Sequence, residues 1–188
     1  MTVSFLPQGI REPLAGFDPG PVIVQAQCRL PQIWVLLQHR GISREVLDAF
    51  VRAKLVYESA EPSADGSKDY HNAVFIGCDE HGVARHAHKR GLYTFGEGFK
   101  RNVTGCDSRY SFHCCGTDDQ LYVFEAPVDM LSFITVHPED WHRHSYVSLC
   151  GTSQNAMMWM LEQNPNLRQA PRFHRSVLHG QKHPAPPG

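Results

Sequence analysis

The sequence lacks several features that would assign the chain to a class at once. No apolar run approaches the roughly 20 residues that span a bilayer. The formal net charge of -1 excludes a basic surface over the whole molecule. The first residues lack the basic and apolar stretches of a signal peptide, and no Gly-x-Ser-x-Gly motif of the serine hydrolases occurs. We therefore expect a cytoplasmic protein without membrane contact, in which nucleic acid could be bound only by a local basic cluster.

The sequence also lacks paired C-x-x-C motifs, although it contains six cysteines. Free thiols in a reducing compartment are the simplest interpretation. Adjacent Cys114 and Cys115 in an extended segment point to opposite faces, which favours one buried and one exposed thiol over two zinc ligands. His142 and His144 lie in a polar stretch and are expected to be solvated. Two sets remain as alternative zinc ligands: Cys78 with His86 and His88, and Cys106 with His113, Cys114 and Cys115.

The residue pattern divides the 188 residues into four segments. Frequent proline and glycine predict an irregular lead-in, and the last nineteen residues, with four prolines and no acidic residue, predict an irregular tail. Between these ends we expect two packed units. The segments are residues 1–31 (lead-in), 32–118 (N-terminal subdomain), 119–169 (second unit) and 170–188 (tail).

The N-terminal subdomain begins with a helical pattern and continues with short strands. A break at Arg40-Gly41 separates residues 32–39 from a second helix over 44–55, for which Ser43 is the expected N-cap. Residues 59–70 read as a polar loop. Residues 72–78 and 83–88 form the strands of a hairpin around the turn at 79–82, with further strands near Tyr93, Val103 and 110–114. These strands predict a small antiparallel sheet.

From Leu121 the pattern changes to an alternation of strands and helices, which is typical of a parallel α/β layer. The first strand ends at Glu125, where open parallel sheets place their ligand sites, and Asp129 falls in the first turn of the next helix. The second strand ends in a turn of Gly151, Thr152 and Ser153, and Ser153 is a possible helix N-cap. The expected elements are strands at 121–124 and 146–150 and helices at 128–136 and 154–162.

Four motifs in order resemble a known family. Val123-Phe-Glu-Ala-Pro-Val-Asp-Met-Leu, followed by Ser148-Leu-Cys-Gly-Thr-Ser, is similar to the Toprim core of bacterial replicative primases. Upstream, Gln38-His-Arg-Gly-Ile-Ser-Arg-Glu-Val-Leu-Asp-Ala-Phe and Asn72-Ala-Val-Phe-Ile-Gly-Cys-Asp-Glu-His-Gly-Val look like that family's helix and hairpin. The resemblance covers about residues 32 to 169, and it points to the primase-like Toprim proteins of mobile elements. It implies an α+β fold in which a small helical and antiparallel N-terminal part precedes an incomplete Toprim-type α/β layer.

The resemblance implies a magnesium-dependent nucleotidyltransferase that makes primers on single-stranded DNA. In such a site Glu125 and Asp129 would hold Mg²⁺ and act catalytically, together with a later Asp-x-Asp motif. This chain contains no Asp-x-Asp, and the strand pattern stops near Gln169. We interpret this as a truncation or a shifted reading frame. The alternative function is a catalytically incomplete fragment that binds nucleic acid or a partner, or has no function.

The expected nucleic-acid contacts lie in a cleft between the two units. A basic strip there would follow the backbone of single-stranded DNA, and Tyr93, Phe95 and Phe99 could stack on bases. A replicative helicase is a possible further partner by resemblance. The alternative interpretation of the strip is a hairpin that simply exposes its charges. The residues expected to contact nucleic acid are Arg85, His88, Lys89, Arg90, Lys100 and Arg101, with Gly151, Thr152 and Ser153 of the turn.

Overall fold

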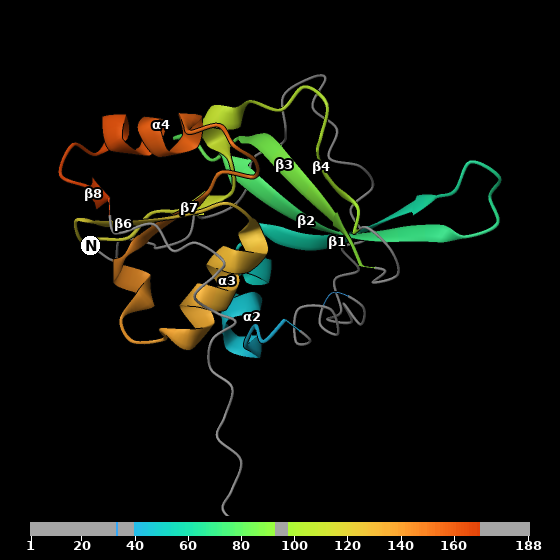
Figure 1. Cartoon of the computed structure of the whole chain (residues 1–188), viewed down its shortest axis with the longest axis horizontal. Coiled ribbons are helices and arrows are strands. Elements are labelled where there is room, and N and C mark those ends of the chain that lie inside the picture. Colours follow the sequence, from blue (N-terminus) through green and yellow to red (C-terminus); the bar gives the residue numbers. More distant parts are fainter. Residues whose placement is uncertain (1–32, 34–39, 93–97, 170–188) are drawn as a thin grey trace, which may run out of the picture.

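The computed structural model describes residues 33, 40–92 and 98–169 (Figure 1). The expectations for the lead-in, the helix over 32–39, the strand near Tyr93 and the tail after Gln169 lie outside these residues. The α+β fold class is confirmed, because an N-terminal antiparallel sheet is followed by a second, mixed sheet with helices. No helix in the described part of the chain is long and apolar enough to cross a membrane.

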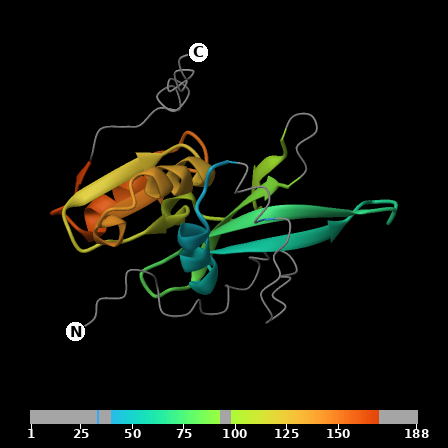
Figure 2. The ribbon, with the colours of Figure 1, turned by 90° about the horizontal axis from the view of Figure 1, so that it is seen from below.

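The first sheet has the strand order β1-β2-β3-β4, with every neighbouring pair antiparallel, as predicted. One expectation was wrong: residues 59–70 are not a loop, because strands β1 and β2 continue into them and leave only residues 63–68 as the connection. The hairpin projects beyond the rest of the molecule (Figures 1 and 2), so polar side chains are tolerated on both its faces. The strands are β1 (Val56–Pro62), β2 (Asp69–Cys78), β3 (Ala84–Gly91) and β4 (Lys100–Asn102).

Helix α2 (Arg44–Arg52) precedes this sheet and begins where the sequence predicts. The hydroxyl of Ser43 accepts a hydrogen bond from the backbone N–H of Val46 at 3.3 Å, which confirms the N-cap. The helix ends earlier than predicted, since Lys54 adopts a left-handed backbone conformation (φ 60°) and Leu55 leads directly into β1. Its apolar stripe, which includes Leu47 and Phe50, is buried.

The second sheet has the order β5-β7-β6-β8. Strand β6 (Gln120–Phe124) pairs in parallel with β7 (Ser145–Ser148) and with the two-residue strand β8 (Arg168–Gln169), so a third parallel strand does begin at Arg168. Residues 110–114 were expected in the first sheet. Instead, Tyr110 ends the short 3-10 helix η1 (Ser108–Tyr110), and the last two residues of the range form β5 (His113–Cys114), which pairs with β7. The first sheet therefore ends at β4, just before Val103.

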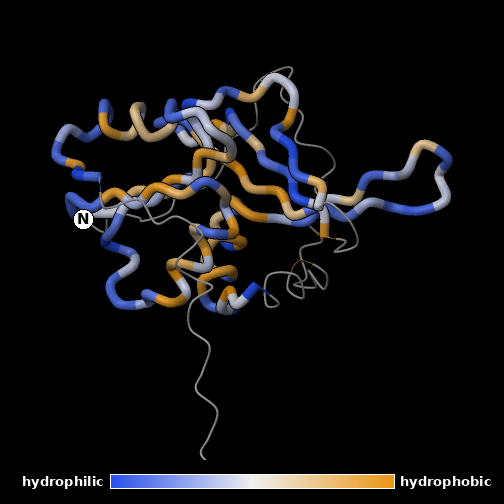
Figure 3. The backbone as a smooth tube through the Cα atoms, viewed as in Figure 1, coloured by the Kyte–Doolittle hydropathy of each residue, from blue (hydrophilic) through white to orange (hydrophobic). Residues whose placement is uncertain are grey.

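Two helices cover opposite faces of the second sheet (Figure 1). Alternate residues of β6 decide which face each helix covers. Leu121 and Val123 pack with α4 (Asn155–Gln163), whereas Phe124 packs on the side of α3 (Pro127–Val136). Figure 3 shows the apolar residues concentrated along these inner strands and helices, while the projecting hairpin is hydrophilic.

A continuous aromatic core joins the two sheets. The ring of Phe112 lies 5.4 Å from those of both Phe50 in α2 and Phe75 in β2, measured between ring centroids. Phe50 also stacks on Trp141 at 5.9 Å. Gly77 of β2 permits the close approach, because a Cβ atom there would lie 1.6 Å from the carbonyl oxygen of Tyr110. These contacts therefore fix the distance between the two sheets.

Candidate functional site

A pocket of about 300 Å³ lies where the first sheet meets the start of α3, and we call it the inter-sheet pocket. It opens at the carboxyl end of β6, the edge at which parallel α/β sheets bind ligands. Residues from both sheets line it: Arg40, His88, Arg90, Lys100, Arg101, Asn102, Glu125, Ala126, Val128, Asp129, Cys150 and Gly151.

The acidic side of the pocket consists of Glu125 and Asp129. Glu125 directly follows β6 and is exposed, and Asp129 is half-buried in the first turn of α3. Pro127 stands at the start of this helix, where its fixed backbone angle suits the first turn. Within the described residues neither carboxylate has a hydrogen-bond or ion-pair partner. Both are therefore available to a ligand in the pocket.

The basic side of the pocket comes from β3, from β4 and from Arg40 in the segment that precedes α2. Arg90 of β3 pairs in register with Lys100 of β4, which places their backbones side by side. Lys100, Arg101 and Arg40 are exposed. Four cationic side chains thus share one small pocket with two carboxylates, an arrangement suited to a phosphate group with a bound cation.

Hydrogen bonds tie the floor of the pocket to the turn after β7. His88 Nδ1 donates to Asn102 Oδ1 at 2.7 Å, and Asn102 Nδ2 donates to the carbonyl oxygen of Cys150 at 3.1 Å. Burial lowers the pKa of His88, although the bond to Asn102 opposes this effect. Burial raises the pKa of the Cys150 thiol to about 12, so it stays protonated and is not a nucleophile at neutral pH.

Two of the expected nucleic-acid contacts in β3 lie outside the inter-sheet pocket. Arg85 donates from Nε to the buried Asp79 at 2.7 Å, and Lys89 Nζ donates to Glu61 at 2.6 Å. The basic stretch of β3 is continuous in sequence, but side chains alternate between the two faces of a strand. Of this stretch, only His88 and Arg90 line the pocket. The role of Arg85 and Lys89 in nucleic-acid contact stays a prediction.

The turn after β7 contributes less than expected to the pocket. Gly151 lines it, whereas Thr152 and Ser153 are exposed and lie outside the lining. The N-cap of α4 is Gln154 rather than Ser153, because the chain enters the helix one residue later. The Ser153 hydroxyl still accepts a hydrogen bond from the backbone N–H of Asn155 at 3.3 Å.

Sequence reasoning missed Arg40 and Asn102 as pocket residues. Arg40 belongs to the Arg-Gly-Ile-Ser motif, which indicated a helix start rather than a ligand contact. Asn102 stands in β4 between a basic pair and an apolar residue, and nothing in that pattern identifies it. Its register opposite His88 is what brings it to the pocket floor.

No group of three or more His, Cys, Asp or Glu side chains that could hold a metal ion occurs in residues 33, 40–92 and 98–169. The expectation for the adjacent thiols is confirmed, since Cys114 is buried and Cys115 is exposed. The expectation that His144 is solvated was wrong. Its Nδ1 donates to Asp118 at 2.6 Å, because the 3-10 helix η2 (Trp141–Arg143) turns the chain toward β6.

Two family models match the chain. Residues 36–118 match a family described as a protein of unknown function (DUF3991). Residues 122–170 match a Toprim-like domain, which links this part of the chain to the DNA-associated, metal-binding domains of primases, nucleases and topoisomerases. Toprim domains generally bind Mg²⁺. No curated protein and no solved structure matches the chain.

Proposed function

We propose that the chain is a primase-like Toprim protein that binds single-stranded DNA in the inter-sheet pocket with the help of Mg²⁺. One observation carries this proposal: the pocket sets Glu125 and Asp129 against Arg40, Arg90, Lys100 and Arg101. Arginine and lysine neutralise backbone phosphates, and carboxylates hold the hard cations that accompany phosphates. The Toprim-like match over the acidic half supports the same assignment.

The residues fit magnesium only together with a phosphate. Mg²⁺ usually keeps several waters and is held by one or two carboxylates plus substrate phosphates. Glu125 and Asp129 supply two carboxylates, and the described residues supply no third acidic ligand nearby. When bound, the ion would neutralise charge on a phosphate oxygen. The chain's own cations would hold the phosphodiester, and α3 would hold Asp129 in place.

Two activities remain proposals for this pocket. The first is template-directed primer synthesis, with Glu125 and Asp129 as catalytic residues. The second is binding of nucleic acid or a replication partner, such as a helicase, without catalysis. The sequence contains no Asp-x-Asp motif, and this favours the second activity for the chain as it stands.

We also propose the domain division at 1–31, 32–118, 119–169 and 170–188, together with an origin in a mobile element. The ranges of the two family models, 36–118 and 122–170, support the inner boundaries.

A shifted reading frame near Gln169 is part of this proposal. Translation of the downstream DNA in the other two frames tests it, and the absence of an apolar strand with Asp-x-Asp there would contradict it.

Fluorescence anisotropy with labelled single-stranded DNA tests the binding site. Arg40→Gln should weaken binding roughly fivefold and reduce the salt dependence of log Kd by about one phosphate contact. Glu125→Gln should remove the strengthening of binding that Mg²⁺ produces. Arg52→Gln, an exposed basic residue of α2 outside the pocket, is the matched control. Equal effects of Arg40→Gln and Arg52→Gln would contradict the proposed site.

A primer-synthesis assay with Mg²⁺ and a single-stranded template separates the two activities. Synthesis that is lost in Glu125→Gln supports the enzyme. DNA binding without synthesis supports the binding module.

A further inference from the structure

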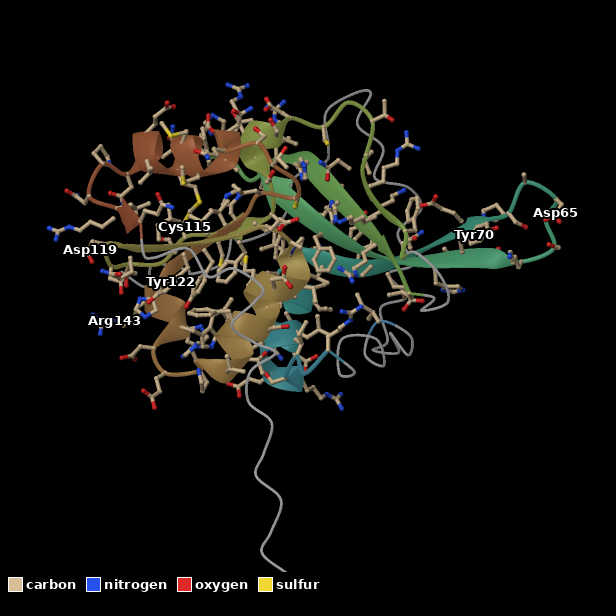
Figure 4. All side chains as sticks on the ribbon, viewed as in Figure 1. Asp65, Tyr70, Cys115, Asp119, Tyr122 and Arg143 are labelled. Atoms are coloured by element: carbon tan, nitrogen blue, oxygen red, sulfur yellow. The ribbon has the colours of Figure 1, made fainter. Side chains whose placement is uncertain are left out.

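A second pocket, of about 390 Å³, lies at the opposite end of α3, and we call it the α3-end pocket. The inter-sheet pocket is lined by Asp129 in the first turn of α3, whereas the α3-end pocket is lined by Val136 and His137 at the end of that helix. A ten-residue helix is about 15 Å long, so the two pockets are separate. Tyr122, in the second sheet, lies far from the hairpin tip that carries Asp65 (Figure 4). The α3-end pocket is also lined by Tyr122, Phe133, Glu139, His144 and Tyr146.

Aromatic rings form most of the wall of the α3-end pocket. Tyr122 is central, with ring centroids 5.1 Å from Phe133, 5.4 Å from His144 and 5.4 Å from Tyr146. His137 lies 4.4 Å from Phe133. Tyr122 and Tyr146 belong to the neighbouring strands β6 and β7, and Phe133 belongs to α3. His137 directly follows α3, and His144 directly precedes β7. Phe133 and Tyr146 are buried behind the others, so the rings that a small ligand can reach are those of Tyr122, His137 and His144.

The charges around the α3-end pocket are predominantly negative. Asp118 accepts the hydrogen bond from His144 and fixes that ring. Glu139 is exposed on the rim and has no hydrogen-bond or ion-pair partner within the described part of the chain. The carboxyl end of a helix adds a partial negative charge. The neighbouring cation, Arg143, lies 3.8 Å from Asp140 and does not line the pocket.

We propose that the α3-end pocket binds an organic cation, a guanidinium or alkylammonium group held against the aromatic rings and Glu139. Cations are attracted to the faces of aromatic rings, and Glu139 and the end of α3 supply the matching charge. A phosphate would be repelled by Glu139. A metal ion would need hard or imidazole ligands in a cluster, and the described residues contain no such group. The cation can be a free amine or the side chain of a partner protein.

Titrations followed by NMR on the isotope-labelled full chain test this proposal. N-acetyl-arginine methylamide should shift the signals of Tyr122, His137 and Glu139, and N-acetyl-citrulline methylamide, its neutral isostere, should bind at least about fivefold more weakly. Agmatine is the probe for a free cation. Binding of agmatine as tight as that of the arginine derivative indicates a free amine, and tighter binding of the arginine derivative indicates a partner side chain.

A substitution of Glu139 tests whether the charge at the rim of the pocket contributes to binding. Glu139→Gln should weaken binding of the arginine derivative roughly threefold to tenfold. Glu162→Gln, an exposed carboxylate at the end of α4, is the matched control and should leave it unchanged. The proposal would be overturned by equal binding of the arginine and citrulline derivatives, or by the absence of NMR shifts with either. It would also be overturned if thymidine, an uncharged ligand with an aromatic ring, produced shifts and the arginine derivative did not. None of these outcomes depends on DNA binding in the inter-sheet pocket.

Discussion

His86 is a buried histidine whose protonation should lower the stability of the folded protein. It is fully buried in β3, and neither ring nitrogen has a hydrogen-bond partner within the described residues. Burial lowers its pKa to about 4, and the neighbouring His88 and His113 act in the same direction while Asp107 opposes them. The imidazole is therefore neutral in the folded protein at pH 7 and would be costly to protonate.

Stability should fall as the pH is lowered from 6.5 toward 4. The unfolded chain binds a proton at His86 near pH 6.5, whereas the folded chain does so only near pH 4. The contribution of neutral His86 to the free energy of unfolding is fully present above pH 6.5 and is lost between pH 6.5 and pH 4, with a magnitude on the order of 3 kcal/mol. Urea unfolding at several pH values measures it.

Two variants isolate this histidine from the others. The pH dependence of unfolding should become shallower in His86→Phe, and His81→Asn, which replaces an exposed histidine, should leave it unchanged. An identical pH dependence in His86→Phe and the parent protein would contradict the assignment.

At the scale of elements, the contact between β2 and η1 depends on a missing side chain. Gly77 lies directly against the backbone of Tyr110 and Ser111, and both contacts involve main-chain atoms that cannot swing away. The two sheets approach each other through this contact. Any side chain here forces β2 and η1 apart.

Gly77→Ala should destabilise the protein by about 2 to 3 kcal/mol, because the added Cβ would overlap backbone atoms. Displacement of β2 and β3 should also weaken DNA binding in the inter-sheet pocket. Gly98→Ala is the control, since a Cβ there meets nothing within 4 Å. Equal midpoints of urea unfolding for the two variants would show that the sheets can separate at little cost.

At the scale of the whole molecule, the shared aromatic core predicts one folding unit. Phe112 contacts rings from α2 and β2 and directly precedes β5 of the second sheet. Buried residues of both sheets belong to one continuous cluster around it. The two matched family regions are thus separate in sequence but joined in their packing.

We expect a single cooperative unfolding transition with coincident fluorescence and circular dichroism curves. Phe112→Ala should lower the free energy of unfolding by about 3 to 5 kcal/mol, because it leaves a cavity between the sheets. Phe99→Ala, which removes a half-exposed ring, should cost far less. Two separate transitions in the parent protein would show that the units fold independently.

Residue patterns predicted the α+β class, the Ser43 cap, the antiparallel sheet and the strand-helix alternation, because each rests on local periodicity or capping. They failed for the projecting hairpin, whose strands are polar on both faces and leave no hydropathy signal. They also failed for residues 110–114, since strand length alone does not say which sheet a short strand joins. Of the basic residues in β3 they could not separate Arg90 from Arg85 and Lys89, because that division depends on which face meets the second sheet.

The Asn102 amide has a consequence for the proton on His88. Its nitrogen donates to the carbonyl of Cys150, so its oxygen must face His88 and accept from Nδ1. Neutral His88 is thereby fixed as the tautomer with its proton on Nδ1, which leaves Nε2 with a lone pair. The floor of the inter-sheet pocket can accept a hydrogen bond from a ligand at that atom but cannot donate one. It therefore favours a hydroxyl or amino group there, while phosphate oxygens are directed toward the cations at the rim.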